Sequence, residues 1–175
     1  LRLVPENLGD IQIEIHGSGD RLQVRLVSAN PSVRDALESQ MGDLKNALIK
    51  AGVEILAKDG VIGLSLRKVA MKAGVSHAAP YAHFADKQAL IAAISTEGFR
   101  QLYERVSGVA EEYQNQPEKQ LVEAAWAYVQ FAMDDPDRFK VMFSGVLEKE
   151  KEYPDFVTES QRNFQLVKMI VEVNQ

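Results

Sequence analysis

The spacing of apolar residues changes once along this chain of 175 residues, and the change restricts the folds that the chain can adopt. In residues 11–15 and again in residues 22–26, apolar side chains occupy every second position. A period of two is typical of a strand with one apolar face, so the two runs predict a β-hairpin. From residue 43 onward apolar residues recur every three or four positions, which predicts helices. We therefore expect a mainly α fold with a small β element in front.

The N-terminal segment contains the signals that end a hairpin and begin a helix. The sequence His16-Gly17-Ser18-Gly19-Asp20 separates the two alternating runs and predicts the turn between them. The apolar residues within positions 1–3 suggest a further strand. Asn30 is expected to be the N-cap of a helix that continues to Met41, because Pro31 fits the first helical position, where its missing N–H costs nothing.

Short helices are expected to follow one another between residues 44 and 94. The first contains an apolar stripe from Leu44 to Ile55 and ends near Gly60, a natural residue for the position after a helix. Three N-caps then predict three further helices: Ser65 for Leu66–Ala73, which Gly74 ends; Ser76 for about His77–Phe84; and Asp86 for a longer helix toward Val106.

The remaining chain predicts a helical region without internal repeats. The segment after Pro117 is rich in Ala and aromatic residues and is expected to form a buried helix. A break at Asp134-Asp135-Pro136 predicts the start of another helix, and residues 156–173 predict a last one.

Two short helices joined by a tight glycine-containing turn are the geometry that places a second helix in the major groove of DNA. Here the first is Leu66–Ala73, the turn is Gly74-Val75-Ser76, and the reading helix is about His77–Phe84. Small residues at the start of the reading helix allow close approach to base edges. Hydroxyl, imidazole and ammonium groups within and after it are suited to phosphate contacts. A purely structural role is expected for Phe84.

Composition excludes several classes of protein. The chain contains no cysteine, which eliminates disulfide scaffolds, Cys-ligated zinc and thiol catalysis. No run approaches the roughly 18 apolar residues of a membrane span, so we expect a cytoplasmic protein. Gly17-Ser18-Gly19 fits neither a nucleophile elbow nor a phosphate loop, and the three histidines lack further ligands at metal spacing. We expect no enzyme activity, no metal and no cofactor.

The net charge of −5 conceals an uneven distribution along the chain. Residues 1–42 carry −2, residues 43–90 carry +3, and residues 91–175 carry −6. The positive balance coincides with the predicted helix-turn-helix, as expected when only one face of a protein meets phosphate.

The stretch from Leu44 to Ile94 resembles the DNA-binding domain of the TetR family of transcriptional regulators, most specifically in GVSHAAPYAHFADKQAL. The resemblance implies that Arg67 and His77 contact bases, with Ala78 and Ala79 in apolar or backbone contact. It also implies phosphate contacts for Ser65, Tyr81, His83 and Lys87. Ser76, at the start of the reading helix, completes the expected set of DNA-binding residues.

The later helices resemble the regulatory half of the same family, most closely in YVQFAMDDPDRFKVMFS. This likeness implies a homodimer and a pocket for a small-molecule effector. The pocket residues it suggests are Phe99, Trp126, Phe131, Phe139, Met142 and Phe143.

Residues 1–48 have a different likeness. LRLVPENLGDIQIEI and NPSVRDAL resemble the C-terminal domain of flagellar hook-length control proteins. That likeness implies a module that contacts a flagellar export-gate protein and catalyses nothing. Both likenesses include the helix from Leu44 to about Val53, and each covers only part of its family's domain, so we expect a composite of two partial domains.

These inferences combine into one prediction with two alternatives. We expect a hook-length-like hairpin and helix at 1–42, a helix-turn-helix domain at 43–90, and an incomplete effector-binding and dimerisation domain at 91–175. The predicted function is that of a regulator, expected to be a repressor, that binds operator DNA as a dimer and is released by an effector. The alternatives are an export-switch interaction module and a non-functional chimera of the two.

Overall fold

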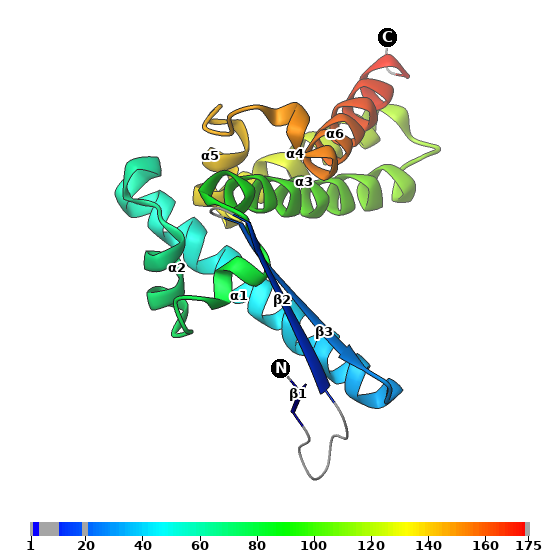
Figure 1. Cartoon of the computed structure of the whole chain (residues 1–175). Helices are drawn as coiled ribbons and strands as arrows, with labels where there is room; N and C mark the ends of the chain where they lie inside the picture. Colours follow the sequence, from blue (N-terminus) through cyan, green and yellow to red (C-terminus); the bar gives the residue numbers. More distant parts are fainter. Residues whose placement is uncertain (1, 4–10, 19–20, 174–175) are drawn as a thin grey trace. The chain divides into compact units, whose positions relative to one another are not determined.

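The computed structural model describes residues 2–3, 11–18 and 21–173 of the chain. It divides into two compact units, unit 1 from Leu1 to Lys87 and unit 2 from Gln88 to Gln175. Each is described here by itself (Figure 1). Most described residues are helical, which confirms the mainly α fold with a β element in front. Among the described residues, no helix is long and apolar enough to cross a membrane.

The β element of unit 1 is a three-stranded antiparallel sheet in the order β1-β2-β3. The strands are β1 (Arg2–Leu3), β2 (Ile11–Ser18) and β3 (Arg21–Ser28). The pairing of β2 with β3 runs from Ile11 opposite Ser28 to Ser18 opposite Arg21. The turn predicted at residues 16–20 is therefore too long, because His16, Gly17 and Ser18 continue the ladder; Gly19 and Asp20 lie outside the described residues.

Helix α1 (Pro31–Gly63) begins where the sequence predicts. The Asn30 side chain accepts a hydrogen bond from the Ser32 amide at 3.1 Å, and Pro31 follows directly. The helix continues past the expected end at Met41 and includes the helix predicted from Leu44. Its one non-helical residue is Gly60, with φ 65° and ψ −172°. Strand β3 packs along α1, so the hairpin and the helix-turn-helix share one continuous helix.

Two further elements complete unit 1. Helix α2 (Leu66–Ala73) has the predicted bounds and packs on α1 through the buried Val69 and Ala70. The helix predicted at His77–Phe84 is wrong: this stretch contains only the 3-10 helix η1 (Ala79–Ala82). Pro80 explains the difference, since within a longer α-helix it would remove a hydrogen bond and clash with the carbonyl of residue 76.

The described residues from Lys87 onward form four helices and one short 3-10 turn, nearly all within unit 2. They are α3 (Lys87–Glu112), α4 (Pro117–Asp134), α5 (Pro136–Phe143), η2 (Glu150–Glu152) and α6 (Pro154–Glu172). Proline stands at the start of three of them, in agreement with its preference for the first helical turn. The expectation that α4 is a buried helix holds for one face only: Phe131 is 4% exposed, whereas Trp126 is 52% exposed.

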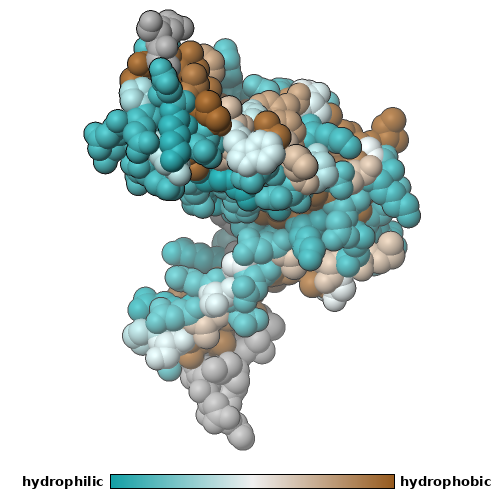
Figure 2. Space-filling view, turned by 180° about the vertical axis from the view of Figure 1, so that it is seen from behind, coloured by the Kyte–Doolittle hydropathy of each residue, from teal (hydrophilic) through white to brown (hydrophobic). Residues whose placement is uncertain are grey.

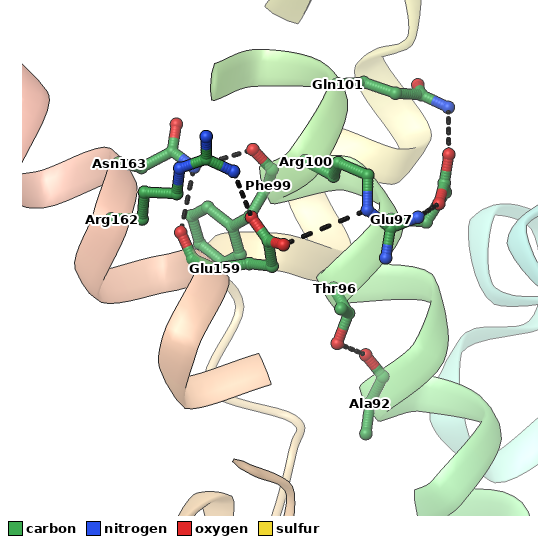
Figure 3. Close-up of polar contacts among 9 residues, drawn as sticks. All are labelled: Ala92, Thr96, Glu97, Phe99, Arg100, Gln101, Glu159, Arg162 and Asn163. Carbon is green, nitrogen blue, oxygen red and sulfur yellow. Dashed lines mark hydrogen bonds and ion pairs between the residues drawn. The ribbon is translucent and has the colours of Figure 1, made fainter. Parts of the chain in front are cut away.

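A buried polar contact joins α3 to α6 (Figure 3). The Asn163 side-chain amide donates to the Phe99 carbonyl oxygen at 2.6 Å and to the Glu159 carbonyl oxygen at 3.0 Å. The Glu159 carboxylate lies 3.9 Å from both Arg100 and Arg162. Since a buried amide without partners would be costly, these bonds fix α6 against α3.

Candidate nucleic-acid interface

The first part of the candidate interface is helix α2, which is capped at both ends. The Ser65 hydroxyl accepts a hydrogen bond from the Lys68 amide at 3.2 Å, and Gly74 ends the helix with φ 70°. A glycine is suited to this position because a Cβ atom disfavours the left-handed region. Leu66, Val69 and Ala70 of α2 are buried in unit 1, whereas the side chains of Arg67, Lys68 and Met71 are exposed.

One lysine of α2 is occupied by an ion pair within unit 1. Lys72 Nζ lies 2.6 Å from Glu54 Oε2 on α1. This hydrogen bond, together with the charge of Lys72, lowers the pKa of the Glu54 carboxyl. Arg67 and Lys68 are therefore the better placed cations of α2 for an external anion.

The reading segment, residues 76–84, is a series of tight turns around Pro80. The Ala79 amide donates to the Ser76 carbonyl oxygen at 3.0 Å, and the Phe84 amide donates to the Pro80 carbonyl oxygen at 2.9 Å. Pro80 is fully buried and Phe84 is 2% exposed, so both fasten the segment to unit 1. The packing role predicted for Phe84 is confirmed.

Side chains of the reading segment differ in their exposure. Ser76, His77 and Ala78 are exposed, whereas Ala79, Tyr81 and His83 are half-buried. Lys87, at the start of α3, is half-buried as well. Exposure is thus greatest at the start of the segment, which agrees with a first turn that approaches a groove.

His83 lies in a more enclosed position than a phosphate contact requires. Its Nε2 atom is buried and has no hydrogen-bond partner within the part of the chain that the structure describes. Burial, and to a lesser degree the charge of Lys45 on α1, lower the pKa of the His83 imidazole. The neutral form is therefore favoured, and the ring lies 6.0 Å from that of Phe84.

Sequence reasoning missed one feature of this site. Strand β3 lies against η1, so the N-terminal hairpin is a neighbour of the reading segment. No local pattern in the sequence indicates this contact. The described residues contain no group of three or more His, Asp or Glu residues that could hold a metal ion.

The residues suggested for an effector pocket lie in unit 2, and most of them belong to one cluster of rings. Ring centroids are 4.8 Å apart for Phe139 and Phe143 and 5.4 Å apart for Phe99 and Phe143. Phe131 contacts Phe139 at 6.4 Å. Met142 packs so closely on Gly98 that a Cβ atom there would overlap it. Trp126 stands on the exposed side of α4.

Comparison with known proteins agrees with the geometry of unit 1. Residues 48–94 match the model of the family described as bacterial regulatory proteins, tetR family. This part of the chain is similar to the tetR family. The match covers the second half of α1, α2, the turn, the reading segment and the start of α3, so the described candidate interface lies within the matched residues.

The tetR likeness extends into unit 2. A 25% identical relative, described as an uncharacterized HTH-type transcriptional regulator YobS of Bacillus subtilis, aligns over 116 residues, which are 66% of this chain and 60% of that protein. The solved structure of a tetR-family regulatory protein from Rhodococcus RHA1 is 20% identical, with a TM-score of 0.65 over 74% of this chain and 68% of the other. The likeness to this solved structure shows that the chain shares its fold.

The N-terminal segment matches a second family. Residues 1–57 match the model of the flagellar hook-length control protein FliK. The flagellar hook-length control protein of Escherichia coli is 34% identical over 55 residues, which are 31% of this chain and 15% of that protein. The chain therefore spans 60% of one curated relative and 15% of the other. The two family models overlap at residues 48–57, within α1.

Proposed function

We propose that this chain is a transcriptional regulator that binds double-stranded DNA through α2 and the reading segment. The observation that supports it most is the exposure of Arg67 on α2 and of Ser76, His77 and Ala78 at the start of the reading segment, within residues that resemble a tetR-family helix-turn-helix. On this proposal Arg67 and His77 meet base edges, and Ala78 and Ala79 allow the backbone to come close.

Charge supports the same proposal. The segment 43–90 carries +3 in a chain of net charge −5. The exposed hydroxyl of Ser65 at the N-terminus of α2, the phenol of Tyr81 and the ammonium of Lys87 are suited to phosphates, which fix a protein on the duplex without reading its sequence. His83 would join them only in its protonated form or after a local shift, because its Nε2 is buried.

The test is fluorescence anisotropy with a pool of random-sequence duplexes at increasing salt. Because binding that neutralises phosphates releases counterions, we expect log Kobs to fall linearly with log salt. Lys87→Ala is expected to weaken binding to all sequences and flatten the salt slope by about one unit. Lys149→Ala, which removes an exposed lysine from unit 2, is the matched control and should leave both unchanged. Absence of binding at low salt contradicts the proposal.

We further propose that two copies associate through unit 2. On α4 the exposed side chains Val122, Trp126, Val129 and Met133 follow a 4-3-4 spacing, which is the seam of a helix that packs against another helix. Helix α6, which packs on α4, exposes Phe164, Val167 and Val171. Figure 2 shows further brown, apolar side chains at the C-terminal end of α6, beside the grey terminal residues.

The size of this surface fits a second copy. At roughly 100 Å² of exposed area for each large apolar side chain, the seven residues offer on the order of 700 Å², close to the ~800 Å² that each partner contributes to a standard interface. A twofold axis would place the same seam on both sides. In analytical ultracentrifugation, Met133→Glu should shift a dimer to monomer, whereas Gln130→Glu on the same helix should not. A monomeric parent chain contradicts this proposal.

For the effector we propose an apolar, aromatic small molecule. The ring cluster leads from Phe143, which is 50% exposed, to Phe99, which is 6% exposed. On this proposal the molecule replaces ring-to-ring contacts among the predicted pocket residues and releases the DNA. The same proposal includes repression of transcription by the DNA-bound protein and its release from DNA when the effector binds.

A second candidate function rests on the match of residues 1–57 to the hook-length family. Here the sheet and the first half of α1 would contact a flagellar export-gate protein. Capture of a purified export-gate domain by the immobilised chain tests it, and equal capture by a variant with charge reversals on β2 would contradict it.

A further inference from the structure

The side chain of Gln88, near the start of α3, forms hydrogen bonds in both directions with the loop that follows α5. Its Nε2 group donates to the Val146 carbonyl oxygen at 3.5 Å, and its Oε1 atom accepts from the Glu148 amide at 2.9 Å. All three residues belong to unit 2. Because the carbonyl oxygen and the amino group of Gln88 each have a partner, the two bonds fix the orientation of its amide as well as its position.

The loop that receives this side chain is itself held in place. The Ser144 hydroxyl donates to the Val141 carbonyl oxygen at 2.9 Å, at the end of α5. Gly145 has φ 67°, a conformation that turns the chain away from the helix. Leu147 lies between the two bonded residues and is 8% exposed. Gln88 is therefore tied to a packed part of unit 2.

Gln88 directly follows Lys87, which we proposed above as a phosphate contact. Helix α3 begins at Lys87, and the first amides of a helix have no carbonyl partner within it, so a first turn opens readily unless other contacts hold it. The chain before Lys87 is anchored as well, because Phe84, three residues earlier, is 2% exposed. The buried ring on one side and the tied amide on the other thus hold Lys87 between them.

Order in this turn favours a contact with an anion. A lysine on an open turn occupies many positions, and it must give up that freedom when a phosphate binds. A turn that is already fixed avoids this loss. The side chains of Lys87 and Gln88 are both half-buried, which restricts the ammonium of Lys87 further.

We propose that Gln88 is a positioning residue for DNA binding: its bonds to Val146 and Glu148 hold the first turn of α3, and that turn holds the ammonium of Lys87 where it meets a phosphate. Gln88 itself does not touch DNA, and its role rests on the proposed function. A phosphate contact of the helix-turn-helix thereby depends on a loop 58 to 60 residues farther along the chain.

The salt dependence of binding tests this role with the full chain and the random-sequence duplex pool. Gln88→Met keeps an unbranched side chain and removes both hydrogen bonds. We expect it to flatten the slope of log Kobs against log salt by about one unit, as Lys87→Ala does, and to raise the Kd about tenfold at about 50 mM salt. Gln101→Met is the matched control on α3. Its glutamine is exposed and bonds only to Glu97 within the helix, so slope and Kd should stay unchanged.

A double variant distinguishes positioning of Lys87 from a general loss of stability. Once residue 87 is alanine, Gln88 has no ammonium to position, so Lys87→Ala combined with Gln88→Met should bind no more weakly than Lys87→Ala alone. Additive losses would overturn the positioning role, and so would a higher Kd for Gln88→Met at the salt slope of the parent. Far-UV circular dichroism checks that each variant keeps its helices.

The outcomes separate this role from the proposed function. If the parent binds DNA and Gln88→Met shows the same slope and Kd, the positioning role is overturned and the regulator remains. If the parent does not bind at low salt, the proposed function itself fails.

Hydrogen exchange in the absence of DNA tests the tie directly. The Glu148 amide donates to Gln88, so its exchange should accelerate in Gln88→Met. The amides of residues 91–92, whose helical partners are the carbonyl oxygens of Lys87 and Gln88, should accelerate with it. If the Glu148 amide accelerates and residues 91–92 do not, the tie does not hold the first turn, and the positioning role is overturned.

Discussion

Helix α2 and the reading segment are neighbours of similar length, and they obtain their shapes in different ways. In α2 the N-cap Ser65, the buried Val69 and the left-handed Gly74 all favour the same eight-residue helix. In the reading segment Ser76 precedes a sequence that suits a helix, yet Pro80 limits it to one 3-10 turn. Agreement among local signals produces a regular element, and one conflicting residue is enough to prevent it.

Among the substitutions that test this difference, Gly74→Ala is expected to have the largest effect on the stability of unit 1. The left-handed conformation of residue 74 costs about 1–2 kcal/mol with a Cβ atom, so the free energy of unfolding of unit 1 should fall by that amount. Urea unfolding followed by circular dichroism measures it, while fluorescence of Trp126, the single tryptophan, reports on unit 2 in the same samples.

Gly108→Ala is the control for that experiment. Gly108 is inside α3, and nothing lies within 4 Å of a Cβ atom built there. The same substitution should therefore stabilise the chain by about 0.5–1 kcal/mol. If both variants destabilise equally, the backbone conformation of Gly74 is not the reason for its glycine.

A smaller effect is expected from Ser65→Ala. Loss of the hydrogen bond from the Lys68 amide leaves a helix N-terminus uncapped, and the free energy of unfolding should fall by about 1 kcal/mol. Ser76→Ala sharpens the contrast, because the Ser76 carbonyl oxygen, rather than its hydroxyl, accepts the bond from Ala79. Its effect should stay within about 0.5 kcal/mol. An equal loss in both variants would show that Ser76 caps the segment after all.

These neighbours also show what can be predicted from the sequence. The bounds of α2, the caps at Asn30 and Ser65 and the prolines that begin α1 and α5 depend on residues within a few positions of one another, and all of them were predicted. The last helix was predicted from residue 156, whereas α6 begins at Pro154. The hairpin and its apolar alternation are equally local. Their signals act over short distances, so they can be read along the chain.

Contacts between distant segments were not predictable in this way. Joining the helices at 30–41 and 44–55 into α1 depends on Gly42, which gives no sign of its conformation and has no atom within 4 Å of a Cβ atom built on it. The contact of β3 with η1 joins residues about fifty positions apart. The exposed seam on α4 looked like a core stripe because spacing alone does not tell which apolar face is covered.

The smallest effect expected here concerns the pH dependence of the reading segment. Burial holds the pKa of His83 below its ordinary value, so the folded chain binds fewer protons than the unfolded chain as the pH falls below about 6.5. Stability of unit 1 should therefore decrease as the pH falls from about 6.5 toward the lowered pKa, and below that value the loss is complete. His83→Gln should remove this dependence, whereas His77→Gln, at an exposed position, should retain it. Urea unfolding at a series of pH values measures the difference. A parent chain whose unit 1 stability rises over the same interval would mean that the His83 imidazole is stabilised in its charged form, and the segment would then present a cation to DNA near neutral pH.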